Sequence, residues 1–386
     1  MRLFHPIPLG WLQLWNRKLR FLVALFGIAF AVLLILMQLG FRASLFESAV
    51  RWHHAFVFDV AIFSHESVFI VRPESFSSRR LYQALAVPGV HSVSPVYLAP
   101  VSWKNTETLA YRSIFTVGID PDDDPLHAPG ISEQLGAIRL QDVVLYDAGS
   151  RPEHGPIAAR VRNGETVTTE ANARTIRVGG LFTLGTSFGI DASMVTSEDN
   201  FLRLFPTRAR TQINLGLIRV EDGVDPAQVR DELRALLPQD VLVMTKADFV
   251  AREIAYWSSA QPIGFVFAFG SIIGFIVGTV IVYQILFSDV SDHLAEYATL
   301  RAIGYSNGFI SRVVVQQALI LAVLGYALGA LATVQLYAVT AKATRLPIEL
   351  TQERALGVLA ATILMCAFSG LLALRKVRKL DPAEVF

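Results

Sequence analysis

Four side chains able to do chemistry lie within one short stretch, namely His53, His54, His65 and Glu66. Imidazole and carboxylate groups could together bind zinc or transfer protons. The H-E-x-x-H spacing of zinc peptidases does not occur among them. We therefore expect these side chains to be solvated or to lie at a membrane interface.

A second candidate is an acidic run, Asp120, Asp122, Asp123 and Asp124, which could in principle bind calcium. The glycine and the distal glutamate of an EF-hand loop are missing, so a solvated acidic loop is expected. The nucleotide-binding pattern GxxxxGK[ST] is also missing. Cys366 is the single cysteine, which excludes an intrachain disulfide and a cysteine zinc site. We expect no enzymatic activity in this chain.

The composition is that of a membrane protein. Apolar residues make up 53% of the 386 residues and charged residues only 17%, against about 25% charged in soluble domains. These figures exclude a disordered chain. The net charge of +1 gives no overall field to attract nucleic acid, so no nucleic-acid partner is expected.

Four uncharged apolar runs, 21–41, 262–287, 313–337 and 355–374, are each long enough to cross a membrane. The first run could instead be a signal peptide, but its length favours an uncleaved anchor. The expected fold is an α-helical membrane protein with four transmembrane helices in a 1+3 order. A large α+β extracytoplasmic domain, residues 42–258, lies between the first two spans, and 338–354 form a short outer loop.

The distribution of Lys and Arg predicts the orientation. Basic residues gather in segment 1–20, in the tail 375–386 and between spans two and three, which places both termini in the cytoplasm. Basic residues in loop 338–354 weaken this asymmetry. In segment 1–20, Trp11, Leu12, Trp15 and Leu19 recur at helical spacing and predict an interfacial amphipathic helix; a simple extension of span one is the alternative.

The two ends of the outer domain read alike. Segment 56–97 predicts strands at 56–63, 68–71 and 90–97 around a helix at 77–85. Segment 213–249 predicts strands at 213–220 and 241–245 around a helix at 226–237, with Asp225 as its N-cap. We therefore expect one α+β subdomain built from both ends of the domain, with residues 105–212 inserted into it.

Glycines recur at four-residue spacing in two of the spans. Gly270, Gly274 and Gly278 share one face of span two, and Gly325 and Gly329 share one face of span three. Such stripes let helix backbones approach closely, which predicts tight helix packing or dimerisation. The spans carry no charged residue, which argues against an ion channel or a secondary transporter.

Residues 288–306 predict a short amphipathic helix at the cytoplasmic surface. Ser288 or Asp289 would cap its start, and Gly304 would end it. Val290, Leu294 and Tyr297 would share one face.

Residues 296–306, Glu-Tyr-Ala-Thr-Leu-Arg-Ala-Ile-Gly-Tyr-Ser, resemble the E-x-A/G-x-L-R-A-x-G signature of the MacB/FtsX superfamily of ABC permeases. The ending 380–386 resembles that of the DevC-type subgroup. Segments 177–182 and 200–205 look like the family's periplasmic core. Gln316 and Gln317 stand where many relatives carry a glutamate.

The resemblance implies a permease subunit in the bacterial inner membrane, paired as a homodimer and bound to a separate ABC ATPase subunit that holds ATP and Mg²⁺. The segment 288–306 would be the coupling helix that receives the ATPase. Its expected coupling residues are Asp292, Glu296, Leu300, Arg301, Ile303, Gly304 and Tyr305.

The resemblance also implies export of a lipid or amphipathic substrate, together with a periplasmic adaptor (a membrane fusion protein), an outer-membrane channel and contact with membrane lipid. Three alternatives stay open. They are an FtsX-like mechanical transmitter to a cell-wall hydrolase, a lipoprotein-release permease, and a membrane sensor without an ATPase.

Overall fold

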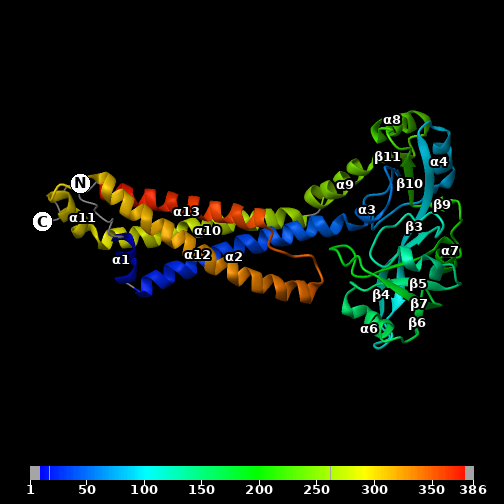
Figure 1. Ribbon diagram of the computed structural model, residues 1–386, viewed down its shortest axis with the longest axis horizontal. Helices are drawn as coiled ribbons and strands as arrows, with labels where there is room; N and C mark the ends of the chain where they lie inside the picture. Colours follow the sequence, from blue (N-terminus) through cyan, green and yellow to red (C-terminus); the bar gives the residue numbers. More distant parts are fainter. Residues whose placement is uncertain (1–8, 17, 261, 379–386) are drawn as a thin grey trace. The chain divides into compact units, whose positions relative to one another are not determined.

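The structure is a computed structural model that describes residues 9–16, 18–260 and 262–378 (Figure 1). The chain forms two compact units. The helical unit comprises the residues up to Ala43, Gly264–Ala341 and the residues from Ile348 onward. The α+β unit comprises Ser44–Ile263 and Lys342–Pro347.

The helical unit is a bundle of long apolar helices that lie side by side in Figure 1. They are α2 (Lys18–Ala49), α10 (Pro262–Asp292), α12 (Asn307–Thr344) and α13 (Gln352–Arg378). All four are long and apolar enough to cross a membrane. They extend past the expected spans 21–41, 262–287, 313–337 and 355–374, because helical hydrogen bonding continues beyond the apolar run. Their shared core includes Ile28, Val282 and Val314.

Two short helices complete this unit, α1 (Leu9–Asn16) and α11 (Leu294–Ala302). The start of α11 differs from expectation, since α10 continues through Ser288 and Asp289 to Asp292. Neither residue can cap a new helix there. Val290 accordingly belongs to α10 and is buried in the bundle.

The α+β unit is built on one nine-stranded sheet with the order β11-β1-β10-β3-β4-β8-β5-β7-β6. Its strands are β1 (Val60–Ser64), β3 (Val90–Lys104), β4 (Tyr111–Ile119), β5 (Val143–Asp147), β6 (Val167–Ala171), β7 (Arg174–Phe182), β8 (Ser193–Ser197), β10 (Leu215–Val220) and β11 (Val241–Thr245). A separate pair joins β2 (Phe76–Ser77) to β9 (Gln212–Ile213). The expected strand at 68–71 is a turn, with a single bridge between Phe69 and Arg72.

The two ends of this unit interleave. β1 lies antiparallel to both β10 and β11, and β10 lies antiparallel to β3. Helix α4 (Ser78–Gln83) leads from β1 toward β3, and α8 (Pro226–Leu236) leads from β10 to β11. Together these elements form a split β-α-β arrangement. β10 lies between β1 and β3, and β1 lies between β10 and β11.

Helices cover both faces of these four strands. On one face α4 and α8 bury Leu81, Val229 and Leu233 against strand residues such as Ile62. Asp225 accepts a hydrogen bond from the Ala227 amide (3.0 Å), which starts α8. The opposite face is packed by α3 (Arg51–Ala55) and α9 (Lys246–Ala255), whose Trp52 and Phe249 join one core. A π-helical turn, Tyr256–Ala260, follows α9.

The middle of the unit is not a separate inserted body. β3 runs on past Tyr97 to Lys104, and its second half pairs with β4. The strands from this middle section therefore extend the same sheet, with α5 (Leu135–Ile138), α6 (Ile157–Arg162) and α7 (Glu198–Leu204) packed on it. Trp103 of β3 also pairs with Ala171 of β6, so this part of the sheet curls back on itself.

Candidate functional site at the loop helix

Helix α11 has one buried and one exposed face. Tyr297 and Ala298 are buried, at 1% and 5% exposure, and Leu300 packs partly buried against the same core. Glu296 and Thr299 are exposed. The three- and four-residue spacing of a helix separates these two sets. The helix therefore holds to the bundle by one face and leaves the other available.

The C-terminal end of α11 is a protruding turn. Gly304 has a φ of +107°, and the Tyr305 amide donates to the Leu300 carbonyl (3.0 Å), so the chain leaves the helix at a left-handed residue. Ile303 is 71% exposed and Tyr305 47%. Two large apolar side chains are thus presented outward at the end of the helix that carries Glu296, as expected of a protein-binding surface.

Asp292 and Arg301 complete the expected coupling residues. The Asp292 carboxylate is held in an ion pair with Arg20, at the start of α2. This pair fixes the end of α10 and leaves Asp292 less available to a partner. The backbone of Arg301 lies in α11, while its side chain lies outside the part of the chain that the structure describes.

A buried polar network lies beneath α11. The side-chain amide of Gln317 on α12 donates to the Asp289 carboxylate of α10 (3.0 Å) and to the side-chain oxygen Oε1 of Gln13 on α1 (3.1 Å). The Tyr297 hydroxyl also donates to Gln13 Oε1, at 3.5 Å. Gln317 is fully buried and Asp289 is 9% exposed. Four helices therefore meet through polar groups that water cannot easily replace.

Two further features hold this network in place. His293 is buried between α10 and α11, and its Nδ1 lies 2.8 Å from the Asp289 carbonyl. Burial, followed by the nearby Asp289 carboxylate, raises the pKa of Tyr297 above its ordinary value, so its hydroxyl stays protonated and remains a donor. None of Gln13, His293 and Gln317 was expected as a site residue from the sequence. The available signal was a glutamine within an otherwise apolar run.

The glycine stripes pack inside the chain. A Cβ on any of the five would meet another helix of the same bundle within 3.1 Å. The nearest atoms belong to Gln38 at Gly270, Ile35 at Gly274, Met365 and Ala31 at Gly278, Ile28 at Gly325, and the Ala29 carbonyl at Gly329. The stripes therefore seat α10 and α12 chiefly against α2, and these faces are not free for a second copy of the chain.

The histidines of the α+β unit do not form a site. His53 is fully buried, against the expectation of a solvated side chain, and its Nε2 lies 3.5 Å from the Glu253 carboxylate. His54, His65 and Glu66 are exposed. Within the described ranges, no group of three His, Cys, Asp or Glu side chains could hold a metal ion.

Residues 185–189, Gly-Thr-Ser-Phe-Gly, have the G-x-S-x-G spacing of a serine-hydrolase nucleophile elbow, although no catalytic motif was expected in this sequence. Such an elbow needs a strand, a sharp turn and a helix. Here the segment joins β7 to β8 without a helix. The Ser187 hydroxyl is buried and accepts from the amides of Gly189 (3.2 Å) and Ile190 (3.0 Å). Ser187 therefore shapes a turn.

Three solved structures resemble part of this chain at low sequence identity. The periplasmic region of MacB from Actinobacillus actinomycetemcomitans is 14% identical and has a TM-score of 0.35, covering 50% of this chain and 91% of that one. The extracellular domain of the noncanonic ABC-type transporter YknZ from Gram-positive bacteria is 16% identical, with a TM-score of 0.34, covering 48% and 98%. A domain of a putative permease protein from Porphyromonas gingivalis is 16% identical, with a TM-score of 0.32, covering 50% and 90%.

No curated protein matches the chain. One family model does, and it is described as FtsX-like permease C-terminal and matches residues 264–382. The matched segment contains α10, α11, α12 and α13, and so includes the exposed face of the loop helix. From α10 to the end of α13 the chain is therefore similar to the C-terminal domain of FtsX-like permeases, the superfamily that residues 296–306 resemble.

Proposed function

We propose that this chain is the permease subunit of an ABC transporter, and that a separate ATPase subunit, holding ATP and Mg²⁺, binds the exposed face of α11. The observation that carries the proposal is the position of α11 within the segment that matches the FtsX-like permease family. Glu296, Ile303 and Tyr305 are exposed on this helix and its end. An apolar centre beside a charge is a suitable composition for a protein interface.

The proposed route of coupling uses the network under α11. Tyr297 joins the loop helix to α1, and Gln317 joins α1 to α10 and α12 through Gln13 and Asp289. Movement of α11 on ATPase binding would be transmitted to these helices through buried polar contacts. Because the glycine faces are occupied within the chain, a permease homodimer would use a different helix surface.

The work done outside is proposed to be export of a lipid or amphipathic substrate, in the manner of DevC-type members, with a periplasmic adaptor and an outer-membrane channel. The chain would lie in the bacterial inner membrane with both termini in the cytoplasm. Four apolar helices and spans without charged side chains suit a substrate handled at the lipid surface.

The testing experiment is a mild-detergent purification of the tagged full chain from its native membrane, with partners identified by mass spectrometry. We expect an ATPase that carries a Walker A motif, together with an adaptor. An ATPase recovered with a cell-wall hydrolase or a lipoprotein carrier would replace the export role. Repeated recovery of the intact chain without any ATPase would contradict the permease assignment.

A further inference from the structure

One edge of the sheet in the α+β unit ends in β11, whose outer side pairs with no other described strand. Two hydrogen bonds fix which backbone groups point outward. The Lys246 amide donates to the Asp59 carbonyl (2.9 Å), and the His65 amide donates to the Asp240 carbonyl (3.2 Å). In an antiparallel ladder such pairs alternate. By the register of β1 and β11, Val241 and Val243 therefore direct their amides away from β1.

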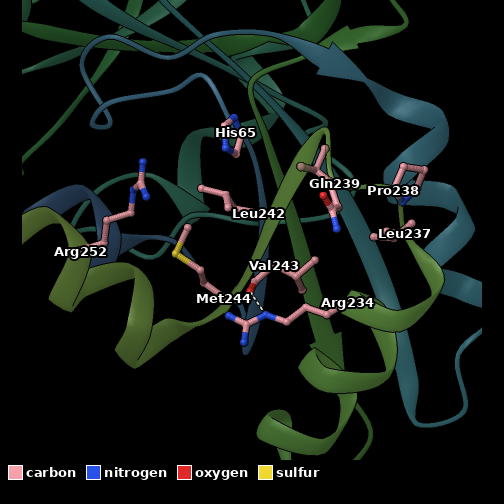
Figure 2. Close-up of a pocket in the computed structure, with 10 residues that line it drawn as sticks. His65, Arg234, Leu237, Pro238, Gln239, Leu242, Val243, Met244 and Arg252 are labelled. Carbon is pink, nitrogen blue, oxygen red and sulfur yellow. Dashed lines mark hydrogen bonds between the residues drawn. The ribbon is translucent and has the colours of Figure 1, made fainter.

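A groove of about 490 Å³ lies along this edge (Figure 2). Leu242 and Met244 point to the side of the strand where His65 and Arg252 lie, and Leu237 and Pro238 lie on the other side. The groove therefore combines a strand edge with apolar side chains on both faces. This is the surface that an additional strand requires, since its alternate side chains pack on opposite faces.

The charges around the groove are one-sided. Arg234, Arg252 and His65 line it, and its described lining contains no carboxylate. Three acidic residues, Asp240, Glu253 and Glu66, directly adjoin a lining residue in sequence, and the Asp231 carboxylate lies 3.9 Å from Arg234. Asp240 is paired with Arg80 at 3.0 Å, and Glu253 is buried and accepts from the Trp257 indole N–H at 3.0 Å. Glu66, beside His65, is exposed but is not among the lining residues. An occupant with carboxylate side chains would therefore meet complementary charge.

Both arginines have donor capacity for such an occupant. Arg252 donates one Nη2 bond to the Ser67 carbonyl (2.7 Å), while its buried Nε has no partner among the described residues. Arg234 donates its Nε to the outward carbonyl of Val243 (2.9 Å), shown as a dashed line in Figure 2. Arg234 thus covers the edge in the way that cationic side chains protect exposed strands.

We propose that the open edge of β11 binds an extended, acidic segment of a partner protein, which joins the sheet as an added strand. The amides of Val241 and Val243 donate to the segment's carbonyls. The segment's amide replaces Arg234 at the Val243 carbonyl, and one of its carboxylates pairs with the released guanidinium. A second carboxylate reaches Arg252. This inference concerns the α+β unit and does not depend on the ATPase partnership.

The test measures binding of a fluorescein-labelled peptide of alternating Glu and Val to the purified full chain, by fluorescence anisotropy. Val241→Pro removes an outward amide without removing a bond to β1, and proline is tolerated at the first residue of a strand. Val241→Ile is its matched control. Arg252→Gln removes the charge, and Arg177→Gln, at an exposed position of β7, is the control for net charge.

We expect saturable binding to the unmodified chain, weakened at least about tenfold by Val241→Pro and by Arg252→Gln, and unchanged in both controls. Thermal unfolding checks that each variant is folded. If Val241→Pro does not fold, Arg252→Gln still tests the proposal. No binding of the peptide, or equal binding by all variants, would overturn the proposal. Equal binding of a peptide of the same composition interrupted by prolines would also overturn the proposal. Self-association of the chain through this edge, with exclusion of the peptide, would overturn it as well.

Discussion

The side-chain amide of Gln317 on α12 lies 3.0 Å from the carboxylate of Asp289 on α10. Both residues are buried, and Gln13 of α1 accepts a second bond from the same amide at 3.1 Å. A neutral donor at position 317 therefore satisfies a buried acid. A glutamate there would place two carboxylates in contact, so the glutamine at position 317 is chemically complementary to Asp289.

Replacing Gln317 with leucine should destabilise the bundle. The change removes the donor and leaves the Asp289 carboxylate without this bond, at a cost of about 1–3 kcal/mol. The measurement is thermal unfolding of the full chain in detergent. The neighbouring Gln316 is only half-buried, so Gln316→Leu is the control and should have a smaller effect. Equal unfolding of the two variants would show that the pair contributes nothing specific.

Charge reversal at Glu296 should weaken ATPase binding while leaving the bundle intact. Glu296 is exposed on the outer face of α11, and its carboxylate accepts a 3.5 Å hydrogen bond from the side-chain amide of Gln13. Glu296→Lys places a positive charge where the proposed ATPase-binding surface of α11 has a negative one. We expect at least about tenfold less ATPase in a pull-down, with unfolding unchanged.

The control for this variant is Glu353→Lys, which reverses an equally exposed glutamate at the start of α13. It should retain the ATPase. Undiminished recovery of the ATPase with Glu296→Lys would show that Glu296 is not part of the ATPase-binding surface. Loss of the ATPase in both variants would show that the effect comes from the change in net charge.

The general plan of both units could be predicted because it rests on local patterns. Uncharged runs mark the long helices, and Asp225 followed by Pro226 marks the start of α8, where the structure shows the expected cap. The interleaved ends of the α+β unit were visible as two β-α-β segments. These features depend on hydrophobicity and turn chemistry within a few residues of each other.

Features that depend on contacts between distant segments were missed. The extension of β3 to Lys104 is set by pairing with β4, and Pro100 within it is a local signal against a strand. The burial of His53 follows from packing against Phe249, which lies far away in sequence. Asp289, which was expected to cap a new helix, lies within α10, and its carboxylate accepts a hydrogen bond from the distant Gln317.

The contact of Gly329 with the backbone of α2 should tolerate no added methyl group. A Cβ at Gly329 would lie 2.6 Å from the Ala29 carbonyl oxygen, a backbone atom that cannot move aside without shifting α2. We expect Gly329→Ala to destabilise the bundle by about 1–3 kcal/mol through overpacking. At Gly357 a Cβ would meet nothing within 4 Å, so Gly357→Ala is the control.

The two alanine substitutions should therefore change the free energy of unfolding in opposite directions. Gly357→Ala is expected to stabilise α13 by about 0.5–1 kcal/mol, since alanine loses less conformational entropy in a helix. The check is thermal unfolding of both variants under identical detergent conditions. Two stabilised variants would mean that α12 does not approach α2 as closely as this packing requires.

The buried pair of His53 and Glu253 should give opposite pH dependences when either partner is removed. Burial lowers the pKa of His53 from 6.5 to about 3 and raises that of Glu253 from 4.5 to about 7. For His53 the folded chain resists protonation, so this residue's contribution to stability falls as the pH drops from 6.5 toward 3. For Glu253 the folded chain favours the proton, so its contribution falls as the pH rises from 4.5 to 7.

Between about pH 4.5 and 6.5 the two slopes oppose each other, and the pair makes little net change to stability. Glu253→Gln leaves only His53, so the free energy of unfolding should rise with pH in this window, by up to about 1.4 kcal/mol per unit. His53→Gln leaves only Glu253 and should show the reverse slope. The two variants share all their other titratable groups, so the difference between their free energies of unfolding isolates the pair. It is measured for both variants at about pH 5 and at about pH 6. Parallel profiles for Glu253→Gln and His53→Gln would show that these two side chains do not titrate as a buried pair.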